Sequence, residues 1–318
     1  MRRRTLITAA LALLMWGLAT IGVGLWLLPS LLLAVPVPPR SAAEREAVRT
    51  SLLSPGAAWT RAEAAGGEGR VLELWRLRRP GSKGVVIYLH GFGDDAWGTL
   101  GRAAELPDWD ALGFTFRGRD RAPQVPCTLG GWERLDVAAA VKHLQGEGVP
   151  RQRILLAGWS MGAGVALLAL QDLEAEGGPL GGALLECPFA DLRAATRDHL
   201  RGTLGPFEVL ARPAEALALR QVQHLARFDP EAVSPLRAAR NLRTPVALVT
   251  GDADRETPVA GVRGIAAGHP DLTVVPGAGH CEASNRLPGG WGAWAGQRLV
   301  RWGLAAPPGL ATVGSPRN

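Results

Sequence analysis

A serine between two glycines is the residue of this chain best suited to act as a nucleophile. Ser160 lies in the pentapeptide Gly158–Gly162, which has the pattern Gly-x-Ser-x-Gly. An apolar run at 154–157 precedes this pentapeptide, and small and apolar residues follow it over 164–170. A strand, a sharp turn and a helix in this order hold a serine hydroxyl clear of the sheet, at the positive end of the helix dipole. The segment therefore predicts a nucleophile elbow that presents Ser160 for acyl transfer.

A nucleophilic serine needs a base, and the chain has six histidines. His280 follows an apolar strand pattern at 272–275 and a glycine-rich loop at 276–279. Imidazole, with an ordinary pKa near 6.5, can accept the serine proton and later return it to a leaving group. His90 ends an apolar run and is expected to organise a loop. The other four are expected to be solvated: His143, His199, His224 and His269. No pair of histidines has the spacing of metal ligands, so we predict no metal site.

A carboxylate must accept the other ring N–H of the base, which selects the tautomer and stabilises the imidazolium. Three acidic residues follow the strand expected at 246–250, namely Asp252, Asp254 and Glu256. Asp252 is suited to bonding loop amides as a turn former. The residue types alone leave all three open.

Apolar and helical patterns alternate along most of the chain, which indicates a mostly parallel sheet with helices on both faces. A half-buried strand is expected at 71–77, where apolar and polar residues alternate. A helix is expected at 135–144. The strands of the buried sheet are expected at 84–89, 112–116, 154–157, 183–186, 246–250 and 272–275.

Four motifs in sequence give the chain a family resemblance. They are HGFGD at 90–94, GWSMG at 158–162, an aspartate after a late strand, and Gly279-His280. In this order, residues 59–304 resemble the α/β-hydrolase superfamily. Within it the chain is most similar to small serine hydrolases with a helical lid, the serine aminopeptidase-like, lysophospholipase-like and esterase members.

The resemblance assigns roles to particular residues. It makes His280 the base, and it selects Asp254 as the acid because relatives carry Gly-x-x-Asp with a proline four residues after the aspartate. The oxyanion hole is then the Met161 amide, directly after the nucleophile, together with the Phe92 amide. The loop residues that support it are His90, Gly91 and Gly93. No cofactor is required for this chemistry.

The stretch at 188–244 is longer than an ordinary crossover between strands of one sheet. Helices are expected at 192–200 and 213–228, so we interpret 188–244 as a lid inserted into a hydrolase domain at 40–306. Residues 307–318 are expected to form a loose tail.

The N-terminus predicts a membrane segment. Three arginines precede an uncharged run from 5 to 39, and the apolar core at 6–28 is long enough to cross a bilayer as a helix. The arginines favour a cytoplasmic N-terminus, which places the hydrolase domain outside the cytoplasm. The alternative is a cleaved signal peptide and a secreted or periplasmic enzyme. The apolar run exceeds the usual length of a signal peptide's apolar region, and no clean cleavage site follows it. We therefore expect residues 1–39 to be an arginine cap and a membrane anchor.

Charge and cysteine content exclude other classes. The net charge of +6 comes almost wholly from scattered arginines, since Lys83 and Lys142 are the only lysines. Aromatic residues are not interleaved with them, so nucleic-acid binding is not expected. Cys127, Cys187 and Cys281 lie far apart in the sequence and predict neither a disulfide framework nor a metal site.

The expected function is hydrolysis of a small-molecule or lipid-like carboxylic ester through an acyl-serine intermediate. The same residues would serve a peptidase, an amidase or a thioesterase. The alternative from another class is a non-catalytic, membrane-anchored binding domain, which predicts a missing catalytic residue. The acyl group, the leaving group and the oligomeric state are left open by the sequence.

Overall fold

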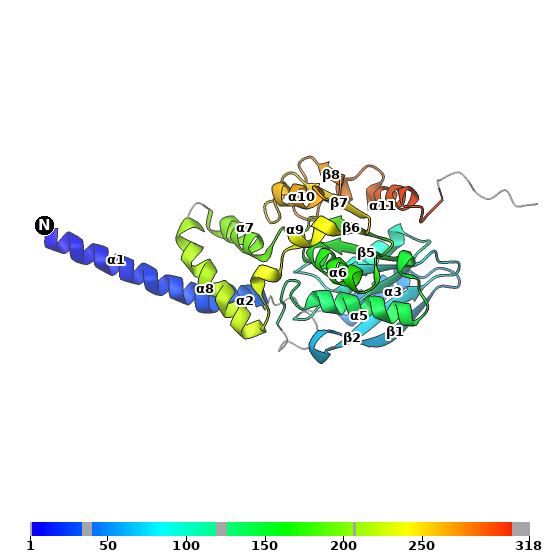
Figure 1. Ribbon diagram of the computed structural model, residues 1–318, viewed down its shortest axis with the longest axis horizontal. Helices are drawn as coiled ribbons and strands as arrows, with labels where there is room; N and C mark the ends of the chain where they lie inside the picture. Colours follow the sequence, from blue (N-terminus) through cyan, green and yellow to red (C-terminus); the bar gives the residue numbers. More distant parts are fainter. Residues whose placement is uncertain (1, 34–39, 119–125, 206–207, 307–318) are drawn as a thin grey trace, which may run out of the picture.

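The computed structural model describes residues 2–33, 40–118, 126–205 and 208–306 (Figure 1). The tail predicted at 307–318 lies outside the described residues, as do 34–39 at the end of the predicted anchor.

The described part of the chain contains one eight-stranded sheet, in the order β1-β2-β4-β3-β5-β6-β7-β8. The first two neighbour pairs, β1 with β2 and β2 with β4, are antiparallel, and all the other pairs are parallel. The mostly parallel sheet predicted from the sequence is confirmed. Its strands are β1 (Ala58–Ala65), β2 (Val71–Arg78), β3 (Val85–Leu89), β4 (Asp110–Gly113), β5 (Ile154–Trp159), β6 (Gly182–Glu186), β7 (Val246–Gly251) and β8 (Asp271–Val275).

The central strands are apolar throughout because both faces of the sheet are covered. Every residue of β3, β5, β6 and β7 is buried. Alternate residues enter different cores, since Leu156 and Leu185 pack on one face and Leu155 and Leu184 on the other. The first core is closed by α5 (Glu133–Gly146), α6 (Met161–Gly177) and α10 (Val259–Ala266), the second by α3 (Ala42–Ser51), α4 (Ala96–Leu100) and α11 (Gly290–Arg301).

One strand differs from its prediction in position. The strand expected at 112–116 is β4, Asp110–Gly113, so it begins at a charged residue. Asp110 is buried there because its carboxylate pairs with the guanidinium of Arg76 in β2, at 2.7 Å. An ion pair between two strands leaves no mark in an apolar pattern, and the pattern alone therefore placed the strand too late.

The segment at 188–244, which the sequence predicts to be an insertion, contains α7 (Leu192–Leu204) and α8 (Glu208–Ala226), followed by the short α9 (Pro235–Ala238). The helix predicted from 213 begins instead at Glu208, and Pro213 lies inside it. Leu219 and Val222 of α8 pack with Phe189 and Leu192 in a separate small core. Figure 1 shows α8 against the N-terminal helix, with α7 packed beside α8.

The N-terminal helix is α1 (Arg2–Gly22), continued by a π-helical turn (Val23–Leu27) and α2 (Leu28–Leu33). By length and composition, Arg4–Ser30 could cross a membrane: its mean hydropathy is 2.1 and its most apolar stretch is exposed. An anchor and a signal sequence both have these properties. The end of α1, the π-helical turn and α2 all pack on α8, and Leu28 lies in a small core with Ala214 and Ala218.

Candidate active site

The turn between β5 and α6 holds Ser160 in a conformation that L-amino acids rarely adopt. Its φ is 51° and its ψ is −115°. Both flanking glycines are required by close backbone contacts. A Cβ on Gly158 would lie 2.7 Å from the Gly162 carbonyl oxygen, and one on Gly162 would lie 2.2 Å from that of Leu89. The local strain is therefore maintained by the packing of β3, β5 and α6 around the serine.

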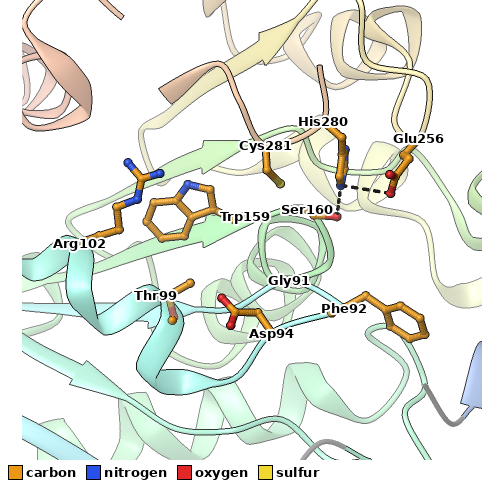
Figure 2. A pocket seen from close by; sticks show the side chains of 12 residues that line it. Gly91, Phe92, Asp94, Thr99, Arg102, Trp159, Ser160, Glu256, His280 and Cys281 are labelled. Atoms are coloured by element: carbon orange, nitrogen blue, oxygen red, sulfur yellow. Dashed lines mark hydrogen bonds and ion pairs between the residues drawn. The ribbon is translucent and has the colours of Figure 1, made fainter. Parts of the chain in front are cut away.

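Three loops at the carboxyl ends of parallel strands bring Ser160, His280 and Asp254 together. Ser160 follows β5, Asp254 follows β7 and His280 follows β8. The Ser160 Oγ lies 2.8 Å from His280 Nε2, and His280 Nδ1 lies 2.9 Å from Asp254 Oδ2 (Figure 2). This chain of contacts has the geometry by which a base activates a hydroxyl while a carboxylate orients the base.

Asp254 is buried and fully engaged by donors. Its Oδ1 accepts the backbone N–H groups of Glu256 and Thr257, each at 2.9 Å, and its Oδ2 accepts the Thr257 hydroxyl at 2.8 Å. Burial alone would raise the pKa of Asp254, but the bonds from His280 and Thr257 outweigh it and lower that pKa. The ionised carboxylate accepts from Nδ1–H, so in the neutral ring Nε2 is left as the acceptor that faces the serine hydroxyl.

Neither of the other two acids contacts His280 Nδ1. Asp252 is exposed, and its Oδ1 accepts the Gly277 backbone N–H at 2.6 Å, which is a loop contact. The Glu256 side chain is 69% exposed and its carboxylate lies 3.7 Å from His280 Nε2, beside the serine rather than behind the ring. Of these three acids, only Asp254 contacts His280 Nδ1 in the part of the chain that the structure describes.

The ionisation of His280 is perturbed by its surroundings. Burial lowers its pKa, but the hydrogen bond with Asp254 and the nearby Cys187 raise it by more. The net effect is a pKa above the ordinary value, so the imidazolium form is favoured by the site. A proton taken from Ser160 would be stabilised on this ring.

The loop after β3 borders the serine on its other side. His90 is buried and spans this loop, with Nε2 accepting the Phe116 backbone N–H at 2.9 Å and Nδ1 donating to the Gly91 carbonyl at 2.8 Å. Gly91 lies against the elbow, where an added Cβ would be 3.6 Å from the Ser160 Cβ. Phe92 and Ser160 line the same cleft, which is described below. Met161 directly follows Ser160 and is the first residue of α6.

A cleft of about 480 Å³ opens over Ser160 and His280. Sequence reasoning assigned no role to much of its wall. Asp94 and Trp159 stand within the HGFGD and GWSMG motifs, whereas Thr99, Arg102 and Cys281 belong to no motif (Figure 2). The Arg102 guanidinium lies over the Trp159 ring, 5.6 Å from its centroid. The described residues of 188–244 contribute nothing to this wall. That the insertion covers the site as a lid therefore stays a prediction.

One expectation from residue type does not hold, and one pair of residues that is distant in the sequence meets in the fold. His269 is buried, and its Nε2 lies 2.8 Å from the Ala239 carbonyl oxygen, so it is not the solvated side chain expected from its loop position. Cys187 and Cys281, far apart in the sequence, have their sulfur atoms 3.3 Å apart beside His280. Cys281 follows the candidate base directly, but only the fold brings Cys187 to it.

Comparison with known proteins agrees with this geometry. Residues 86–286 match the alpha/beta hydrolase family. An acetyl-hydrolase of Streptomyces hygroscopicus is 38% identical over 157 residues, which cover 46% of this chain and 48% of that protein. The chain thus matches about half the length of this curated relative.

Solved structures show the same fold. An esterase of Pyrococcus furiosus is 19% identical, with a TM-score of 0.56 over 84% of this chain and 98% of its own. An esterase of Thermogutta terrifontis is 20% identical, with a TM-score of 0.56 over 80% and 95%. An acylaminoacyl peptidase of Pyrococcus horikoshii is 14% identical, with a TM-score of 0.56 over 83% of this chain and 44% of its own.

The mostly parallel eight-stranded sheet and the strained turn at Ser160 agree with the family match over residues 86–286. The chain belongs to the alpha/beta hydrolase family.

Proposed function

We propose that the protein hydrolyses carboxylic esters through a covalent acyl-serine intermediate, with Ser160, His280 and Asp254 as its catalytic triad. The continuous contact from Ser160 Oγ through His280 to Asp254 Oδ2, at 2.8 and 2.9 Å, is the observation that carries the proposal. The names of the relatives, an acetyl-hydrolase and two esterases, support an ester as the substrate.

In the proposed reaction His280 Nε2 takes the proton of Ser160 as Oγ attacks the ester carbonyl. The negative oxygen that develops is bound by the backbone N–H groups of Met161 and Phe92. His280 then protonates the leaving alcohol. It next takes a proton from water, which attacks the acyl-serine, and returns that proton to Ser160 Oγ as the acid is released. Asp254 stays ionised throughout and stabilises the imidazolium.

The size of the cleft supports a small substrate. A volume of about 480 Å³ lies within the range of small-molecule sites. The ring of Trp159 and the side chain of Phe92 supply apolar wall, whereas Asp94 and Arg102 carry charge at other points of it. We propose short-chain esters as the substrates turned over best.

Labelling and a substrate panel test this proposal. A fluorophosphonate should modify Ser160 in the folded protein, and Ser160→Ala should remove both the adduct and hydrolysis of p-nitrophenyl acetate. The panel compares p-nitrophenyl esters of increasing chain length, monoacyl lipids and aminoacyl anilides. Strong anilide turnover with negligible ester turnover would replace the esterase by a peptidase or amidase. If no adduct forms on Ser160, the proposal of an esterase is wrong and the alternative, a non-catalytic binding domain, is favoured.

We further propose that the N-terminal helix is a retained membrane anchor, with the hydrolase domain outside the cytoplasm. Packing of its last turns on the domain supports retention. Gly24 lies so close to α8 that an added Cβ would be 2.9 Å from the Ala214 carbonyl oxygen. Leu33 is buried in the small core of the insertion, and its carbonyl accepts the Cys127 backbone N–H at 2.9 Å. Cleavage after Leu33 would remove these contacts.

The mass of the mature protein tests retention, since an anchored protein keeps residues 2–33 and a secreted one loses them. Protease protection in intact cells tests the topology. A C-terminal tag should be digested from outside, and a shielded tag would count against the outward orientation.

A further inference from the structure

Two cysteines that the sequence separates by a large part of the chain meet beside the candidate base. Cys187 directly follows β6, and Cys281 directly follows His280. Their sulfur atoms are 3.3 Å apart, and the ligating atoms of Cys187, Cys281 and His280 lie within 4.8 Å of one another. Sulfur atoms so close need to approach by little more than 1 Å to reach the ~2.05 Å of a disulfide bond.

We propose that Cys187 and Cys281 form a reversible disulfide that ties the loop carrying His280 to the end of β6. Both residues have positive φ, 44° at Cys187 and 54° at Cys281. Backbone conformations with positive φ are unfavourable for residues other than glycine, so local backbone preference does not explain why both cysteines adopt them. The conformation does place the two sulfur atoms together.

The exposure of the two thiols sets the order of the reaction. Cys281 is partly exposed and lines the cleft, so its thiolate can attack a low-molecular-weight disulfide, such as oxidised glutathione, and release one thiol. Cys187 is 1% exposed, and burial raises the pKa of its thiol. It therefore reacts second, attacking the Cys281 sulfur of the mixed disulfide and releasing the second thiol. The protein loses two electrons and two protons, and the oxidant becomes two thiols.

A metal ion fits the same three residues less well. In a tetrahedral zinc site with Zn–S bonds near 2.3 Å, two thiolates stand roughly 3.8 Å apart. Here they are closer, at 3.3 Å, and both ring nitrogens of His280 already have partners in Ser160 and Asp254. The geometry therefore favours a bond between the sulfur atoms.

The bond would close a loop that includes the insertion, β7, Asp254 and β8. Long closed loops lose much of their freedom in the unfolded chain, which stabilises the folded state. We expect the oxidised protein to unfold at a higher temperature than the reduced protein.

Thiol counting tests the proposal on the full-length chain in detergent. The denatured protein should show three free thiols after reduction and one, that of the buried Cys127, after treatment with oxidised glutathione. Peptide mapping without reduction should recover the peptides of Cys187 and Cys281 joined, with the loss of two hydrogens. Dithiothreitol should restore all three thiols and the lower unfolding temperature.

Variants make the test specific, and none of these readouts depends on hydrolase activity. Cys281→Ser, at the partly exposed position, should keep two thiols and one unfolding temperature under both conditions. The matched control Cys127→Ala should still lose two thiols on oxidation. The proposal is overturned if three thiols survive oxidised glutathione, or if Cys281 stops at a stable mixed disulfide. Stoichiometric zinc binding by the reduced pair without disulfide formation would also overturn it.

Discussion

At the scale of single residues, Asp254 and Asp252 show how two nearby carboxylates come to differ. Asp254 turns inward, where two backbone amides, a hydroxyl and the imidazole all donate to it. Asp252 stays at the surface and closes the loop to Gly277. The difference in burial, rather than in residue type, makes Asp254 the candidate partner of the base.

Asp254→Asn should lower kcat for ester hydrolysis by about 10⁴-fold, because an amide can hold the imidazole in the wrong tautomer. Circular dichroism should show that the variant remains folded. Asp252→Asn is the matched control and should stay within a few-fold of the unmodified enzyme. The assignment is wrong if the Asp252 variant is the inactive one and the Asp254 variant keeps near-normal kcat.

The raised pKa of His280 predicts how activity depends on pH. The protonated ring cannot act as a base, so kcat/KM should fall as pH drops through the folded-state pKa, at a pH above the ordinary 6.5. Protonation of His280 beside the ionised Asp254 also contributes stability that is present below 6.5 and is lost as pH rises through the folded-state pKa of the ring. The same pair is lost at acid pH, as pH falls through the lowered pKa of Asp254.

Asp254→Asn removes a group that raises this pKa, so the acid limb of its residual kcat/KM profile should move to lower pH. Profiles for both enzymes on a neutral ester measure the shift. An unmoved limb would show that Asp254 does not control the ionisation of the base.

At the scale of elements, the elbow depends on the approach of α6 to the end of β3. A Cβ on Gly162 would be 2.2 Å from the Leu89 carbonyl oxygen and 2.7 Å from that of His90. Both are backbone atoms of a buried strand end, which cannot move aside as a flexible side chain could. The glycine is therefore a packing requirement of the turn as well as part of its motif.

Gly162→Ala should destabilise the fold by about 3 kcal/mol or more and abolish fluorophosphonate labelling of Ser160. Gly296→Ala is the matched control in α11, where an added Cβ meets nothing within 4 Å. Alanine favours a helix interior, so this control should be neutral or more stable by up to ~1 kcal/mol. Urea denaturation of both proteins decides the matter. Equal midpoints would contradict the packing argument.

At the scale of the whole molecule, the N-terminal helix and the insertion form one unit at one end of the hydrolase domain (Figure 1). The outer part of the helix is exposed and apolar, and its last turns are packed on α8. This arrangement places α7 and α8 next to the membrane in the proposed anchored state.

Gly24→Leu should separate the helix from α8, because its Cβ would be 2.9 Å from the Ala214 carbonyl oxygen and from the Leu217 Cβ. We expect faster cleavage of α8 by trypsin in the detergent-solubilised protein. Gly17→Leu, where an added Cβ meets nothing within 4 Å, is the control and should leave the cleavage rate unchanged. If the two variants are digested equally fast, the helix is not docked on the insertion.

What the sequence by itself determined is local. Apolar runs predicted the buried strands, because a strand covered on both faces must be apolar throughout. The elbow at Ser160 was recognisable because its strand, turn and helix are consecutive, and His280 because a glycine-rich loop precedes it. Asp254 needed a family resemblance, since the residue types alone also left Asp252 and Glu256 open as candidates.

The tertiary structure alone decided which distant residues meet. The Arg76–Asp110 ion pair, the cleft wall of Thr99 and Arg102, and the approach of Cys187 to Cys281 follow from the order of strands in the sheet. An apolar strand can be buried equally well beside many different strands. Its pattern of apolar residues therefore does not specify which strand lies next to it. The neighbours of each strand are decided only when the whole chain packs together.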